Sequence, residues 1–259
     1  MSLGAERKLR AEVADISARL YRKGWVANHD GNVSVRSGDR FLATPTAFSK
    51  AAVTPDDVLT VDAAGKVVQG RHRVFSEWNL HAACYARPDV HAVVHAHPPM
   101  ATGFSVSGAR LLEKPFLAEA VVSLGPGIPT TAFAAPGPAA AAALAPLLAE
   151  HDAVLLANHG VIAVGADLEQ AYLRLELVEH LANIAYFAHH TGGVRALPDA
   201  ALPALLEARK KAGLGPAARA PAGSAALATP TTPPPAAPVA KSPDLATIIR
   251  EELVRTLQK

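Results

Sequence analysis

Cysteine and long apolar runs are almost absent from this chain of 259 residues. Cys84 is the only cysteine, which excludes an internal disulfide framework and any metal site built from several cysteines. The longest apolar stretches are far shorter than the roughly 20 residues that a membrane-spanning helix needs. The N-terminal segment, MSLGAERKLRAEVADISARL, is charged and lacks the apolar core of a signal peptide. We therefore expect a cytoplasmic protein that neither spans a membrane nor is exported.

A charge excess of either sign is missing as well. The chain carries 25 basic and 23 acidic residues, for a net charge of +2, and they are spread along its length. The sequence has no basic stripe, so nothing in its charge pattern points to a nucleic-acid partner. The hydrophobic fraction is 50%, and the length suits one globular domain of roughly 200 residues plus a tail. A phosphorylated small molecule stays compatible with this balance, because backbone N–H groups and hydroxyls bind phosphate without a basic patch.

Hydrophobic periodicity and turn residues predict a chain in which helices alternate with short strands. We expect helices at 6–23, from a capping Ser76 to about Arg87, at 101–106, at 137–150, and from a capping Asp167 to about His190, with a short element at 118–124. Strands are expected near 33–35, 41–48 and 90–97, in a hairpin at 58–70 with its turn at 64–66, and as two strands at 153–165 around a loop at 158–160. This order predicts an α/β fold with a mostly antiparallel or mixed sheet covered by helices.

The composition changes abruptly after Gly213. Residues 216–243 contain eight prolines among alanines and threonines, a composition that cannot build a core and predicts a disordered, Pro/Ala-rich linker. A last segment at 242–259 has an apolar stripe at helical spacing, opposite charged residues, and predicts an amphipathic helix. The stripe consists of Leu245, Ile248, Ile249, Leu253 and Leu257. We therefore divide the chain into a folded domain at 1–213, a linker at 214–241 and a helix at 242–259.

Three histidines predict a metal site. His95 and His97 stand in VVHAHPP, and side chains two residues apart in a strand point to the same face. His159, in LLANHGVIAVG, would complete three imidazole ligands from a distant loop. Zinc is the first expectation, and three protein ligands leave a coordination position open for a substrate oxygen. In a chain with 11 histidines an HxH pair alone also fits an ordinary surface or core position, so the interpretation depends on the surrounding motifs.

One carboxylate and several small polar residues are candidates for the rest of a site. Glu77, in VFSEWNLHAACY, stands at a predicted helix start, from which it could reach the histidine strand and exchange a proton with carbon. The alternative is a first-turn glutamate that the helix dipole favours. The small polar residues suit anion binding through N–H and hydroxyl groups, although such residues are common in turns anyway. They are Gly31, Asn32, Ser34, Thr44, Thr46 and Ser76.

Five motifs in a fixed order, GNVSVR, ATPT, SEW, VVHAHPP and NHGVIAVG, make residues 7–190 resemble the class II aldolase and adducin family. The resemblance implies a three-layer α/β/α sandwich, commonly assembled as a homotetramer with active sites between subunits. It also implies that Glu77 is the catalytic acid and base, and that zinc is the cofactor. By the same likeness the metal ligands are His95, His97 and His159, and the residues around the substrate phosphate are Asn32, Thr46 and Ser76.

The activity implied by the resemblance is that of a zinc-dependent aldolase, an aldehyde-lyase of carbohydrate metabolism. Its substrate would be a small ketose phosphate of the fuculose or rhamnulose phosphate type, cleaved to dihydroxyacetone phosphate and an aldehyde. Zinc would stabilise the enediolate left by carbon–carbon cleavage, and Glu77 would protonate it. Epimerisation, decarboxylation and dehydration use the same kind of chemistry and stay open. A non-catalytic, adducin-like scaffold is a further alternative, although such a scaffold needs no histidine triad.

Three departures from the aldolase pattern bear on the substrate. Ala47 stands where fuculose-phosphate aldolases have a glycine after TPT, and Phe75 stands where they have a second serine before SEW. Both changes would narrow or dry a phosphate pocket. The segment EKPFLAEAV lacks the tyrosine that serves as a second proton donor, and Phe116 has no hydroxyl to replace it. Glu119 or a residue of a neighbouring subunit would have to take that role.

The predicted linker and terminal amphipathic helix resemble encapsulation peptides, which route enzymes into bacterial microcompartments. This resemblance implies shell proteins as partners of residues 242–259. Two alternatives are a helix that docks on its own tetramer and an end without structure. A short helix of this kind is marginal alone in water, so it would become ordered only against an apolar partner surface.

Overall fold

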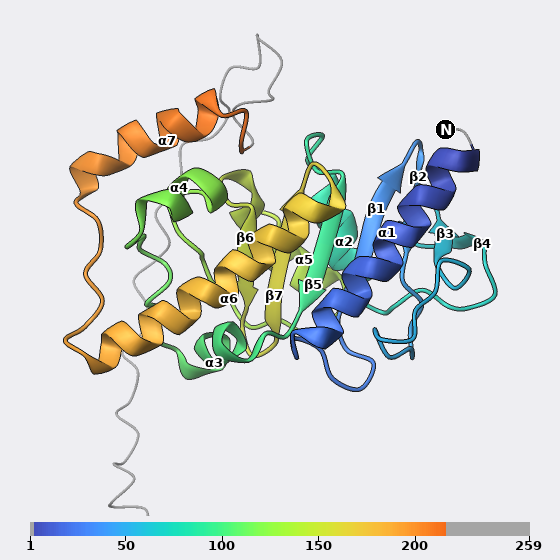
Figure 1. Ribbon diagram of the computed structural model, residues 1–259, viewed down its shortest axis with the longest axis horizontal. Coiled ribbons are helices and arrows are strands. Elements are labelled where there is room, and N and C mark those ends of the chain that lie inside the picture. Colours follow the sequence, from blue (N-terminus) through green and yellow to red (C-terminus); the bar gives the residue numbers. More distant parts are fainter. Residues whose placement is uncertain (1–2, 216–259) are drawn as a thin grey trace, which may run out of the picture. The chain divides into compact units, whose positions relative to one another are not determined.

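The computed structural model describes residues 3–215 and has a seven-stranded sheet at its centre (Figure 1). The strand order is β4-β3-β2-β1-β5-β7-β6, and every neighbouring pair is antiparallel. The strands are β1 (Asn32–Ser37), β2 (Arg40–Ala43), β3 (Leu59–Val61), β4 (Val67–Gln69), β5 (Ala92–Ala96), β6 (Ala153–Leu156) and β7 (Gly160–Gly165).

Helices cover both faces of this sheet. The helical elements are α1 (Leu3–Arg22), α2 (Trp78–Tyr85), α3 (Pro99–Ser107), α4 (Ala118–Leu124), α5 (Pro138–Leu144), η1 (Leu147–Ala149), α6 (Leu168–His190), η2 (Asp199–Ala201) and α7 (Leu202–Lys211). Helices α1, α3, α4 and α6 share one apolar core with Val33 and Val94, whereas α2 and α5 share the other with Val93 and Ile162 (Figure 1). This is the predicted three-layer α/β/α sandwich, and its antiparallel sheet confirms the predicted fold class.

The register of the central strands places polar residues on the face that α2 covers. Asn32 of β1 lies beside His95 of β5, and His95 lies beside Ile162 of β7. Because side chains alternate along a strand, Val33 and Val94 point into the opposite core. The start of β1, the end of β5 and the start of β7 therefore lie next to one another, at the same end of these three neighbouring strands.

Most predicted elements are confirmed. Asp167 caps α6, since its side chain accepts a hydrogen bond from the Gln170 backbone N–H at 2.7 Å. The β3–β4 hairpin forms around Asp62, whose side chain accepts hydrogen bonds from the N–H groups of Ala64 and Lys66. These are local interactions between residues at most four apart, which is why the sequence pattern predicted them.

Two predictions of local structure were wrong, and one helix was missed. Ser76 does not cap α2, which begins at Trp78 with Glu77 in the N-cap position and no side-chain cap. The helix expected at 137–150 is divided into α5 and η1, because Pro146 has no N–H to continue the hydrogen-bond ladder. Helix α7 was not predicted at all. It is attached to the rest of the domain through Arg209, which donates hydrogen bonds to the buried carboxylate of Asp152 and to the Val122 carbonyl.

Among the described helices, none is both long and apolar enough to cross a membrane. The predicted amphipathic helix at 242–259 lies outside the described residues, as does the predicted linker apart from its first two positions. The division of the chain at residues 213 and 241 therefore stays a prediction.

Candidate active site

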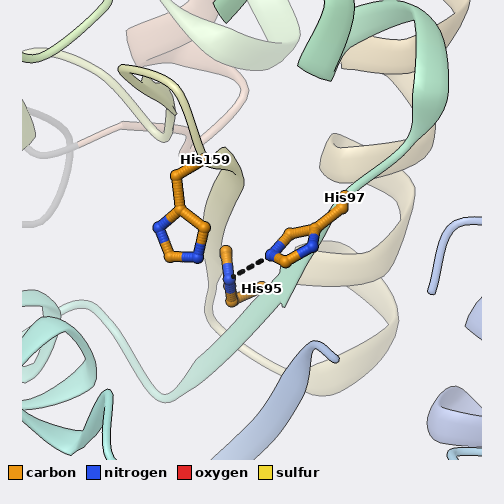
Figure 2. A group of neighbouring side chains, drawn as sticks. All are labelled: His95, His97 and His159. Atoms are coloured by element: carbon orange, nitrogen blue, oxygen red, sulfur yellow. Dashed lines mark hydrogen bonds between the residues drawn. The ribbon is translucent and has the colours of Figure 1, made fainter. Parts of the chain in front are cut away.

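Three histidines converge where the central strands meet. His95 is in β5, His97 follows directly after it, and His159 is the last residue of the β6–β7 loop. One nitrogen of each ring lies within 4.8 Å of the others, and the ring centroids are 4.7 to 4.9 Å apart. Figure 2 shows the three rings turned toward a common space. The structure thus brings together side chains that the sequence separates by more than sixty residues.

The hairpin that carries His159 is shaped to approach His97 closely. Asn158 has a φ of +56°, which turns the chain sharply, and the His159 N–H then donates to the Leu156 carbonyl at 3.0 Å. Gly160 follows. A Cβ atom on Gly160 would lie 2.5 Å from Cδ2 of His97, far inside contact distance. The missing side chain therefore lets the hairpin lie against the His97 ring.

The imidazoles fit a metal ion. Nδ1 of His95 lies 2.8 Å from the Val161 carbonyl and donates to it, which leaves Nε2 free as a ligand atom. The Nε2 atoms of His95 and His97 lie 3.1 Å apart (Figure 2). Burial lowers the pKa of His95, and burial with the neighbouring histidines lowers the pKa of His97 to about 4. Both rings are neutral near pH 7, the form that binds metal, so the cluster could hold a divalent cation.

Glu77 lies beside the histidine cluster. Its Oε1 is 2.9 Å from Nε2 of His159, and its Oε2 is 3.5 Å from Nε2 of His95. Burial alone would raise the pKa of Glu77, but His95, His159 and a hydrogen bond from Asn32 outweigh it and hold the pKa below its usual range. The carboxylate is therefore ionised and stands within reach of whatever the three imidazoles bind.

The face of β1 behind Glu77 is polar and buried. Asn32 donates to Glu77 at 2.7 Å and contacts His81, which contacts Ser34, which contacts Tyr85. Reasoning from the sequence missed His81 and Tyr85. The available signals were the spacing of four residues between Glu77 and His81, one helical turn, and the alternation that places Asn32 and Ser34 on one face of a strand.

Two of the three predicted phosphate-binding residues lie on neighbouring loops. Thr46 is half-buried, and its backbone N–H donates to the Arg73 carbonyl at 2.9 Å, which brings its loop beside the segment that leads to the exposed Ser76. The third, Asn32, is only 3% exposed, and both ends of its amide are engaged inside the protein. The role of these residues toward phosphate stays a prediction.

The structure also shows the surroundings of the positions at which the sequence departs from the aldolase pattern. Ala47 keeps the left-handed conformation that suits a glycine, with a φ of +60°. The Phe75 ring is buried and packs against Trp78 and His81. Glu119 is exposed in the first turn of α4; its role as a second proton donor stays untested.

A cavity of about 240 Å³ adjoins Glu77 and His159. The segment 131–140 forms much of its wall, which is largely apolar, and Phe133 on this wall is 74% exposed. This cavity gives a small molecule access to the carboxylate and to the third imidazole.

Lys50 is a buried cation near the site. Its side chain is 2% exposed, and Nζ donates to the His29 and Phe48 carbonyls, each at 3.1 Å. Burial lowers the pKa of Lys50 to about 8, although Asp30 and Glu77 oppose this shift. The side chain joins the loop before β1 to the loop after β2. It was not among the predicted site residues, because nothing local in the sequence marks a lysine as buried.

This fold and this site define a class: the chain belongs to the class II aldolase and adducin family. The family model described as the Class II Aldolase and Adducin N-terminal domain matches residues 11–186. The match confirms the resemblance predicted from the five motifs.

Individual relatives and a solved structure support the same family. An L-fuculose phosphate aldolase from Methanococcus maripaludis is 31% identical over 182 residues, which cover 69% of this chain and 97% of that protein. A methylthioribulose-1-phosphate dehydratase from Methylococcus capsulatus is 32% identical over 191 residues, covering 69% and 93% respectively. The solved structure of an L-fuculose 1-phosphate aldolase matches with a TM-score of 0.70 and 27% identity, covering 77% of this chain and 95% of that one.

Proposed function

We propose that this protein is a zinc-dependent class II aldolase. It cleaves a small ketose phosphate of the fuculose or rhamnulose phosphate type to dihydroxyacetone phosphate and an aldehyde. The observation that carries the proposal is the convergence of three imidazoles beside one ionised carboxylate, which lines a cavity together with His159. The names of the relatives supply the sugar-phosphate class.

The proposed chemistry divides the work between the metal and the protein. His95, His97 and His159 would hold the cation, which would polarise the substrate oxygens next to the bond that breaks. In condensation the ionised Glu77 would take a proton from the adjacent carbon; in cleavage the proton lost by the substrate hydroxyl would pass to Glu77, which would then give it to that carbon. Asn32, at 2.7 Å from Oε2, keeps that carboxylate oriented while its other oxygen stays near His159. Thr46 and Ser76 would contact the phosphate.

The decisive experiment combines metal analysis with a substrate panel. The purified protein, loaded with zinc, is expected to bind one ion per chain and to release dihydroxyacetone phosphate from at least one ketose phosphate. His95→Ala and His159→Ala should lose the metal, because three ligands are the minimum for a catalytic zinc site. Glu77→Gln should keep the metal but lose at least about 100-fold in kcat, the lower range for a removed general acid and base. A fully active Glu77→Gln enzyme would exclude the role proposed for Glu77.

A dehydratase is the second candidate, favoured by the 32% identical methylthioribulose-1-phosphate dehydratase. It would use the same residues to eliminate water without cleaving a carbon–carbon bond. The two activities differ in product, since only the aldolase releases an aldehyde and a three-carbon phosphate. The same product analysis distinguishes epimerase and decarboxylase activities. Metal analysis distinguishes an adducin-like scaffold, which is expected to bind no metal.

The remaining proposals concern location and assembly. We propose a homotetramer in the cytoplasm, with residues 242–259 binding microcompartment shell proteins. Fusing residues 241–259 to a fluorescent protein and expressing the fusion with shell proteins tests the targeting role. Recruitment to the shell supports the role, and a diffuse signal excludes it. Light scattering of the purified chain measures the subunit count.

A further inference from the structure

A chain of four side-chain hydrogen bonds leads from the apolar core to Glu77. The hydroxyls of Tyr85 and Ser34 lie 2.7 Å apart, and Ser34 Oγ lies 2.7 Å from Nδ1 of His81. Nε2 of His81 lies 2.5 Å from Oδ1 of Asn32, and Nδ2 of Asn32 donates to Oε2 of Glu77 at 2.7 Å. Ser34 and His81 are fully buried, and Asn32 and Tyr85 are nearly so. Burial makes each of these hydrogen bonds costly to leave unmade.

The donors and acceptors of these four hydrogen bonds can be assigned in one direction. A carboxylate only accepts hydrogen bonds, so the NH₂ end of Asn32 faces Glu77 and its oxygen faces His81. Nε2 of His81 must then carry the ring's proton and donate it to that oxygen. Nδ1 is left as an acceptor for the Ser34 hydroxyl, and Ser34 in turn accepts from Tyr85. Each of the four hydrogen bonds then has one donor and one acceptor, and the His81 ring is neutral.

The opposite direction fails at the far end of the chain. If Nδ1 of His81 carried the proton, Ser34 would accept from it and would have to donate to Tyr85. The Tyr85 hydroxyl proton would then need another acceptor, and among the described residues its only side-chain partner is Ser34. A buried hydroxyl without an acceptor is unfavourable. Tyr85 at one end and Glu77 at the other therefore require the same direction of the hydrogen bonds.

We propose that His81 is a positioning residue for Glu77: its neutral ring donates from Nε2 to Asn32 and thereby holds the amide with its NH₂ group toward the carboxylate. This inference rests on the proposed function, in which Glu77 moves the substrate proton. The Nε2–H form fixes the orientation of Asn32, which a free amide could reverse. His81 lies one helical turn after Glu77 on α2 and is fully buried, so it acts through Asn32 and not by direct contact with a substrate. The chain ends inside the core at Tyr85, so it orients Glu77 and does not conduct protons to solvent.

Burial supports the neutral state of the ring. The pKa of His81 is lowered to about 3, because burial disfavours the imidazolium; the nearby His95 acts in the same direction and the carboxylate of Glu77 against it. The ring is also enclosed by aromatic neighbours, Phe75 at a centroid distance of 4.7 Å and Trp78 at 6.2 Å. These neighbours oppose a rotation of the ring that would exchange the positions of its two nitrogens.

The first test reads the tautomer directly and needs no substrate. Nitrogen-15 NMR of the zinc-loaded, histidine-labelled protein near pH 7 should show His81 protonated on Nε2 and unprotonated on Nδ1. The resonance is assigned by its loss in His81→Phe, or by its shift in Ser34→Ala if that variant does not fold. A ring protonated on Nδ1, or on both nitrogens, overturns the proposal. This result stands whether or not the protein turns over a sugar phosphate, so it separates failure of this inference from failure of the proposed function.

The second test asks whether His81 acts through Asn32. His81→Phe keeps a ring of similar size and should lower kcat about 10-fold to 100-fold, with KM changed little and zinc content unchanged. In an Asn32→Ala background the same substitution should change kcat less than about twofold, because the positioned amide is already gone. A purely structural role would instead give the same loss in both backgrounds, and that result, like full activity in His81→Phe, overturns the proposal.

Two further variants keep this test interpretable. Should His81→Phe fail to fold, Ser34→Ala breaks the chain one bond further out and should show the same cancellation in the Asn32→Ala background. His151→Phe is the matched control. It removes a different, half-buried ring, whose Nδ1 donates one hydrogen bond to the Leu147 carbonyl away from Glu77, and it should leave kcat unchanged.

Discussion

At the scale of single residues, the metal site depends on an absent side chain. Gly160 begins β7 directly after His159, and a Cβ there would lie 2.5 Å from His97 and 2.6 Å from the Ala96 carbonyl. The carbonyl belongs to the backbone of the strand that carries His95 and cannot move aside without shifting that strand. Any side chain at Gly160 must therefore disturb two of the three proposed ligands.

Gly160→Ala is expected to lower zinc affinity about 10-fold to 100-fold, the range seen when the supports of metal ligands are removed. Competition with a chromogenic chelator measures the affinity. Gly103→Ala is the matched control, because no atom lies within 4 Å of its would-be Cβ in α3. It should leave zinc affinity unchanged. Equal affinities for the two variants would contradict the close contact inferred at Gly160.

The buried ring of His81 predicts a pH dependence of stability. Its pKa is about 3 in the folded protein, whereas an unfolded histidine titrates near 6.5. Because the folded pKa is depressed, the contribution is complete above about pH 6.5 and is lost as the unfolded chain takes up a proton below it. Between pH 7 and pH 5 this single group should cost about 2 kcal/mol of unfolding free energy.

Urea unfolding of the metal-free protein at both pH values measures this loss. His81→Phe has no titrating group at this position, so its own loss between pH 7 and pH 5 should be about 2 kcal/mol smaller. The other histidines contribute alike in both proteins and cancel. An identical loss in wild type and variant would mean that His81 is not held neutral.

At the scale of secondary-structure elements, one carboxylate joins three segments that are distant in sequence. Asp152, directly before β6, is fully buried. It accepts hydrogen bonds from Arg87 after α2 at 2.8 Å, from Arg174 in α6 at 2.6 Å, and from Arg209 in α7. This cluster explains why a helix as polar as α7 has a defined position, which the apolar pattern of 202–211 does not indicate.

Asp152→Asn is expected to destabilise the protein by about 3 to 5 kcal/mol, because three guanidinium groups would lose the buried charge of Asp152, although Arg87 would keep its pair with Asp89. Urea unfolding measures the change. The control is Glu113→Gln, which breaks the exposed 2.8 Å pair with Arg110 and should change stability by less than about 0.5 kcal/mol. A small effect of Asp152→Asn would mean that the arginines find other acceptors or water.

At the scale of the whole molecule, the sheet, both cores and all proposed ligands lie between residues 3 and 211. The family match ends earlier still, at residue 186. We therefore predict that a chain shortened to residues 1–215 keeps its zinc content and its kcat, and changes its unfolding free energy by less than about 0.5 kcal/mol. Loss of the metal on shortening would show that the last 44 positions support the site.

Local patterns predicted much of this molecule. Alternation along β5 placed His95 and His97 on one face, and the cap at Asp167 marked the start of α6. Each of these signals lies within a few neighbouring residues. The boundary errors at Ser76 and Pro146 also arose locally, where one turn residue competes with helical spacing.

The amino-acid sequence by itself determined the α/β class, the family and the set of candidate ligands, because periodicity, caps and motif order are written in short stretches of chain. Only the tertiary structure decided that Asn32 points at Glu77, that His81 stands behind it, and that α7 is anchored at Asp152. These contacts join positions 45 to 57 residues apart. Their partners are selected by strand register and by the cost of burying an unpaired polar group, which no local pattern records.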